Sequence, residues 1–93
     1  MRAFESRLNG KRLCIAGIEE GTVLCSVACT ENENGRGDVE LGVTAISYLK
    51  EELVRWQRRT LRVKDVVRVR LIETNKVDKP KLLQKGFAKK KSK

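Results

Sequence analysis

The chain has 93 residues, with 21 Lys and Arg against 12 Asp and Glu, a net charge of +9 and no histidine. This length is that of one domain with a small core, and chemistry that depends on histidine is excluded. No run approaches the roughly 20 apolar residues of a membrane span, and Arg2, Glu5 and Arg7 interrupt any signal sequence. We therefore predict a soluble cytoplasmic protein that does not contact a membrane.

The first half of the chain is predicted to form β-strands. Alternation over residues 4–8 is followed by Asn9-Gly10, a strong hairpin signal because both residues accept the positive φ of a type I′ turn. The apolar run 13–18 predicts a central strand, and the alternating runs 22–29 and 39–45 predict two more. The polar, glycine-rich segment 31–38 is predicted to be a surface loop.

The period of the sequence changes after residue 45. Apolar side chains recur at three- and four-residue steps, at Ile46, Leu49, Leu53 and Trp56. This spacing is typical of an amphipathic helix, and Ser47 is a suitable N-cap for it. Alternation returns over 61–71, with a tight turn predicted at Lys64-Asp65, and Pro80 is predicted to end regular structure.

Together these elements predict a mainly β (α+β) fold. We expect about five antiparallel strands in a curled sheet or partly open barrel, with one short helix. The domain is predicted to span residues 1–79. Residues 80–93 are predicted to be a basic, mobile C-terminal tail, because they are rich in lysine and carry little that can pack.

No catalytic or metal-binding set is predicted. Cys14, Cys25 and Cys29 lack the close pairing and the histidines of zinc ligands, and no imidazole is present to activate a thiol. We interpret them as small buried hydrophobic residues. The acidic pairs Glu19-Glu20 and Glu51-Glu52 are interpreted as solvated turn and helix charges. The protein is therefore predicted to be neither an enzyme nor dependent on a cofactor.

The positive charge is concentrated in the second half of the chain. Residues 55–93 hold fifteen basic and three acidic residues, whereas residues 1–54 hold six basic and nine acidic ones. Such asymmetry indicates a polyanionic partner. If the predicted helix and the following strand present their basic sides together, phosphates can be neutralised there. The candidate binding residues are Arg55, Arg58, Arg59, Arg62, Arg68, Arg70, Lys89, Lys90 and Lys91.

Two segments of the chain resemble small uncharacterised bacterial β-rich proteins. The first is Phe-Glu-Ser-Arg-Leu-Asn-Gly-Lys-Arg-Leu-Cys-Ile-Ala-Gly-Ile at 4–18. The second is Arg55-Trp56 followed by 61–69, although the relatives more often have glycine at the position of Lys64. The resemblance implies a compact bacterial β domain and carries no assigned activity.

The sequence thus predicts a small binding module that contacts nucleic acid or an acidic protein through a basic face. Two alternatives stay open. One is a protein–protein interaction module, in particular a homodimer formed through strand edges, with no nucleic-acid role. The other is that the basic side chains only keep a strand-rich protein soluble.

Overall fold

The computed structural model describes residues 1–35 and 37–86, and these form seven strands. The strands are β1 (Arg2–Leu8), β2 (Lys11–Ala16), β3 (Thr22–Cys29), β4 (Val39–Ser47), β5 (Glu52–Thr60), β6 (Val67–Glu73) and β7 (Leu82–Lys85). All pairings are antiparallel, and they give two sheets with the orders β2-β1-β6 and β3-β4-β5-β7. The mainly β class is confirmed. The predicted count of five strands is wrong, and the strands form two sheets rather than one.

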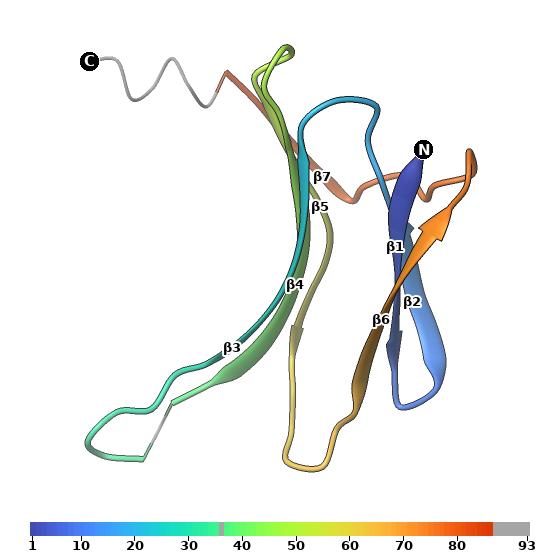
Figure 1. Cartoon of the computed structure of the whole chain (residues 1–93). Helices are drawn as coiled ribbons and strands as arrows, with labels where there is room; N and C mark the ends of the chain where they lie inside the picture. The colour runs from blue at the N-terminus through green and yellow to red at the C-terminus, as the bar shows by residue number, and fades with distance from the viewer. Residues whose placement is uncertain (36, 87–93) are drawn as a thin grey trace.

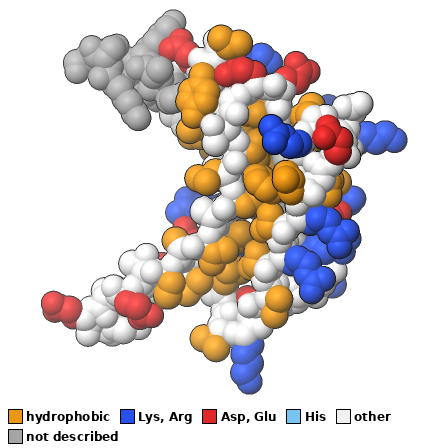
Figure 2. Space-filling view, in the orientation of Figure 1, with side chains coloured by type: hydrophobic (Ala, Val, Ile, Leu, Met, Phe, Trp, Pro, Cys, Tyr) orange, Lys and Arg blue, Asp and Glu red, His pale blue; other side chains and the backbone are white. Residues whose placement is uncertain are grey.

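The two sheets pack face to face, with the core between them (Figure 1). Alternation along β4 buries Leu41, Val43 and Ala45 almost completely and leaves their neighbours on the outer side. The three-stranded sheet contributes Cys14 and Ala16 to the same core. Hydrophobic side chains accordingly fill the space between the two layers in Figure 2.

The predicted hairpin at Asn9-Gly10 is confirmed. Asn9 has a φ of 52° and Gly10 a φ of 86°, and the turn joins β1 to β2. The Asn9 side chain also accepts a bond from the Val66 amide and donates one to Asp65, at 2.8 and 3.0 Å. This contact ties the hairpin to the loop that precedes β6.

The predicted helix over residues 46–56 is wrong. These residues belong to the end of β4, a turn and the start of β5, and the two strands pair antiparallel beginning with Ser47 opposite Glu52 next to the turn. Leu49, expected on the buried stripe, is 83% exposed at the turn, and Glu51 has a φ of 52°, which a helix does not accept. The apolar spacing matched a helix only by coincidence, because Ile46 and Leu53 are register partners on the outer side of the sheet, whereas Trp56 is buried in the core.

Each sheet contains a bulge that changes which side chains point outward. In β5 the register passes from Arg55 opposite Thr44 to Gln57 opposite Val43, so Trp56 is the extra residue and both Trp56 and Gln57 are buried. Arg58 therefore points away from the core, where regular alternation from Trp56 would have aimed it inward. In β2 the register shift at Leu13 turns Arg12 outward in the same way.

Residues 74–81 form a strap between β6 and β7. The Asp78 amide donates to the Ile15 carbonyl, and its carboxylate accepts from the Ile15 amide, both at 2.9 Å. The β2 strand, predicted to be central, is thus an edge strand whose free side the strap covers. Regular structure continues beyond Pro80, because β7, within the segment predicted to be a tail, pairs with β5.

None of the described residues forms a helix long and apolar enough to cross a membrane.

Candidate polyanion-binding face

Three arginines form a row across the three-stranded sheet. Arg7 on β1 is the register partner of Arg12 on β2 and of Arg68 on β6. Residues directly opposite each other on neighbouring strands point to the same face, and the strands are about 4.8 Å apart. The three side chains therefore leave the same side of the sheet from neighbouring backbone positions.

Two positions further along β1 and β6, Glu5 and Arg70 point to the same side of the sheet and are also register partners. This side is the outer one, because Ser6 and Cys14, which alternate with these residues, are buried against the core. We call this surface the arginine face and define it by five residues, which are Glu5, Arg7, Arg12, Arg68 and Arg70. Figure 2 shows Lys and Arg side chains gathered along the flank formed by this sheet.

Arg7 is held in place at the centre of the arginine face. Its Nε lies 3.5 Å from a carboxylate oxygen of Glu5, and its Nη1 donates a 3.1 Å hydrogen bond to the Gly10 carbonyl. A small cavity of about 100 Å³ lies between Arg7 and Arg68, with Gly10 and Val66 completing its walls. A guanidinium fixed in this way loses little conformational freedom when it binds, which suits it to an anionic group of phosphate size.

The arginine face carries four positive charges and one negative charge. Arginines directly opposite each other on adjacent strands destabilise a sheet, by up to about 1 kcal/mol a pair. Arg7 is paired with Glu5, whereas no ion pair joins Arg12, Arg68 or Arg70 to an acid within residues 1–35 and 37–86. An anion bound on this side would relieve the repulsion.

The predicted site residues divide between the two outer faces of the sandwich. Arg68 and Arg70 lie on the arginine face. Arg55 and Arg58 lie on the outer face of the four-stranded sheet, where their register partners are Thr44 and Gly42. There Arg58 is paired with Glu40 at 3.5 Å. The helix expected to bring these groups together does not exist, so the two pairs point away from each other.

The remaining predicted residues take no part in either outer face. Arg59 is the register partner of the core residue Leu41, and its Nε donates to Gln57 at 3.2 Å. Arg62 lies in the turn before β6, where the predicted tight turn is confirmed by the bond from the Asp65 amide to the Arg62 carbonyl. Lys89, Lys90 and Lys91 lie outside the described residues.

Sequence reasoning missed Arg7 and Arg12, because both lie in the half of the chain that has a net negative charge. The two-residue turn at Asn9-Gly10 sets Leu8 opposite Lys11 and Arg7 opposite Arg12, so the predicted hairpin was a signal that the two arginines are neighbours. The bulge at Leu13, which lies beyond the pair of Arg7 and Arg12 and sets Cys14 opposite Ser6 on the core side, has no signature in the sequence.

The cysteines are free thiols, and no group of three or more His, Cys, Asp or Glu within the described ranges is arranged to hold a metal ion. Burial raises the pKa of Cys25 to about 11 and also raises the pKa of Cys14. Both thiols are thus protonated at neutral pH. Cys14 fits its interpretation as a small buried residue, whereas Cys29 is exposed.

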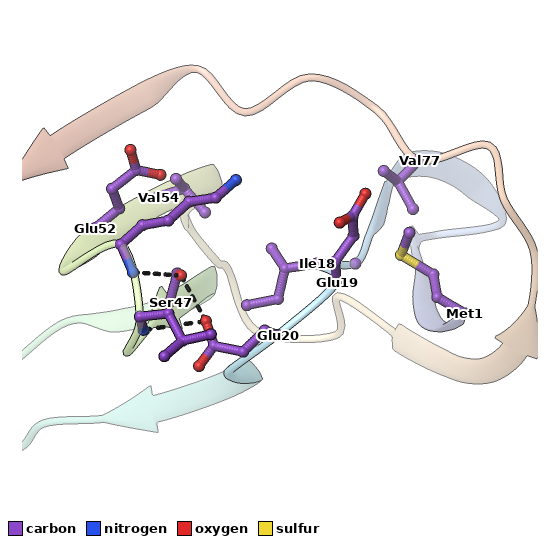
Figure 3. A pocket seen from close by; sticks show the side chains of 11 residues that line it. Met1, Ile18, Glu19, Glu20, Ser47, Glu52, Val54 and Val77 are labelled. Atoms are coloured by element: carbon purple, nitrogen blue, oxygen red, sulfur yellow. Dashed lines mark hydrogen bonds between the residues drawn. The ribbon is translucent and has the colours of Figure 1, made fainter.

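A cavity of about 370 Å³ opens at the end of the sandwich between the 18–20 segment and the β4–β5 turn (Figure 3). Its lining combines apolar side chains, among them Ile18 and Val54, with charged ones, among them Glu20. The carboxylate of Glu20 accepts bonds from Ser47 Oγ at 2.7 Å and from the Tyr48 and Leu49 amides at 3.2 Å each. These bonds lower the pKa of Glu20 and hold the turn, so this carboxylate is engaged in structure.

Comparison of the chain with family models, with curated proteins and with solved structures found no match. The resemblance to bacterial β-rich proteins therefore stays a prediction, and the arginine face is interpreted from its geometry.

Proposed function

We propose that the protein is a non-enzymatic binding module that contacts the phosphate backbone of nucleic acid through the arginine face. The observation that carries the proposal is the row of Arg12, Arg7 and Arg68 in direct register across three strands. Guanidinium groups match phosphate oxygens with two parallel hydrogen bonds, and a row of them on one side of the sheet can contact several phosphates of one chain.

The composition of the face favours contact with phosphates over recognition of bases. No aromatic residue is among the outward-pointing residues of β1, β2 and β6 described above, so bases have no stacking surface there. Phosphate contacts carry no sequence information. We therefore expect affinities for duplexes of different sequence to agree within about threefold.

The chain offers a matched control, because Arg55 and Arg58 place the same charges on the opposite side of the sandwich. The double change Arg7→Ala and Arg68→Ala is expected to weaken binding to a labelled duplex by at least about tenfold, or roughly 1.4 kcal/mol. The double change Arg55→Ala and Arg58→Ala is expected to leave affinity within about twofold. Fluorescence anisotropy at fixed salt measures both.

An acidic protein is the alternative partner for the same face. Binding to polyglutamate with equal or higher affinity than to a duplex of the same charge would favour that partner over nucleic acid. The proposal includes a cytoplasmic location, with which the free thiols of Cys14, Cys25 and Cys29 are compatible.

A further inference from the structure

Three of the four sheet edges formed by the described strands carry a feature that discourages pairing with another chain. The edge of β2 is covered by the strap through Asp78 and Ile15. The edge strand β7 has only four residues and ends in Lys85. The edge strand β6 carries Arg68 and Arg70. Covering, shortness and charge are the usual ways in which proteins protect an edge.

The edge of β3 has none of these protections. Its eight residues, Thr-Val-Leu-Cys-Ser-Val-Ala-Cys, include no charged residue, no glycine and no proline, in a chain of which 35% is charged. Leu24 and Val27 are each 56% exposed. Within residues 1–35 and 37–86, β3 pairs only with β4, so the hydrogen-bonding groups on its other side face solvent.

We propose that β3 pairs antiparallel with β3 of a second copy of the chain, joining the two four-stranded sheets into one of eight strands. A two-fold axis pairs the same strand of two copies, so any charged side chain on that strand lies close to the like charges of the other copy. The β6 edge would set Arg68 and Arg70 close to their own copies, whereas β3 sets only apolar and small polar side chains together. The second copy supplies an uncharged strand of the same length.

The symmetry of such a dimer also determines the directions in which the two arginine faces point. The axis that relates two antiparallel strands of one sheet is perpendicular to that sheet, so each copy keeps its outer surface on the same side. Both arginine faces would then point in one direction, and one long polyanion can contact both. The pairing itself depends only on β3 and stands whether or not the arginine face binds nucleic acid.

Charges beside β3 give the dimer a salt dependence opposite to that of phosphate binding. Glu19 and Glu20 precede the strand, and Glu31 and Glu33 follow it. Antiparallel pairing brings the acids at the start of one strand toward those at the end of the other. Salt screens this repulsion, so the dimer is expected to tighten as salt is raised.

Sedimentation velocity of the full chain tests the proposal across a range of concentrations. We expect a species of twice 10.6 kDa. Val27→Lys, on the β3 edge, is expected to weaken the dimer by at least about tenfold. Val69→Lys, the matched change on the edge strand β6, is expected to leave it unchanged; Val69 is 41% exposed. A monomer at all concentrations, or equal effects of the two changes, would overturn the proposal.

Hydrogen exchange of the unaltered chain gives a second test that does not depend on the folding of a variant. Amides of β3 that point away from β4 are expected to become more protected as protein concentration rises, while those of β6 do not change. Protection that rises on β6, or that does not change on β3, would contradict the pairing.

Discussion

The indole Nε1 of Trp56 donates a 2.6 Å hydrogen bond to the carbonyl oxygen of Asp78. Trp56 belongs to β5 of one sheet, and Asp78 is bonded through its amide and carboxylate to Ile15 of β2 in the other. One residue of the strap therefore connects the two layers along one side of the sandwich. The β3 and β6 edges lie at the other ends of the two sheet orders.

Replacement of Trp56 by Phe is expected to lower the free energy of unfolding by about 1–3 kcal/mol, because the Asp78 carbonyl loses its hydrogen-bond donor and the core loses part of the volume of the buried indole. Tyr48→Phe is the control, since it removes an exposed hydroxyl whose bond to Thr22 is 3.1 Å long and should change stability by less than about 0.5 kcal/mol. Chemical denaturation followed by circular dichroism measures both. Equal effects would show that the indole bond is unimportant.

Glu20 is expected to make stability depend on acid. Its hydrogen bonds, that from Ser47 first, hold the pKa of Glu20 below the ordinary value of 4.5. Since the pKa of Glu20 is lower in the folded state than in the unfolded state, the ionised carboxylate stabilises the fold. This stabilisation is fully present above the unfolded-state pKa and is lost as pH falls through the folded-state pKa.

Denaturation of the Glu20→Gln variant over this acidic range should show a shallower loss of stability than that of the unaltered chain. The pKa of Asp65 is also lowered, chiefly by the hydrogen bond from the Arg62 amide, so part of the loss of stability with falling pH is expected in both proteins. Identical pH profiles would contradict the assigned role of the Glu20 carboxylate.

Asn9 is expected to set the position of Arg7 and Arg12 relative to Arg68, because its side chain bonds the loop before β6. Asn9→Ala loses these bonds and also places alanine at a φ of 52°, so we expect a loss of about 2–3 kcal/mol. Asn9→Gly loses only the bonds and should cost about 1–2 kcal/mol. Thermal unfolding in which Asn9→Gly is less stable than Asn9→Ala would contradict the role assigned to the positive φ of Asn9.

Salt dependence distinguishes phosphate contacts from other binding. If each of Arg7, Arg12, Arg68 and Arg70 contacts one duplex phosphate, the arginine face contributes about −3.6 to the slope of log K against log salt. Arg7→Ala with Arg68→Ala should reduce the slope by about 1.8, and Arg55→Ala with Arg58→Ala should not change it. Titrations at several salt concentrations give the slopes.

Much of the fold was readable from local patterns. The Asn9-Gly10 turn and the strand over 22–29 lie where the sequence predicts them, because turn chemistry and alternation are local properties. The helix was wrong since the same apolar spacing fits two strands joined by a short turn, and the choice between them depends on pairing with β3 and β7.

The candidate site was harder to predict than the fold. The sequence identified Arg68 and Arg70 by their alternation, but their partners Arg7 and Arg12 lie more than fifty residues away and meet them only through the pairing of β1 with β6. The bulges at Leu13 and Trp56 decide whether Arg12 and Arg58 point outward. Such shifts arise from the packing of whole sheets, which no local pattern encodes.

Mapping of amide chemical shifts during titration with a short duplex tests the central proposal most directly. The largest changes are expected on β1, β2 and β6 around Arg7, Arg12, Arg68 and Arg70, with little change at Arg55 and Arg58. Changes confined to β4 and β5, or to residues beyond 86, would show that a polyanion binds elsewhere and that the arginine face is not the site.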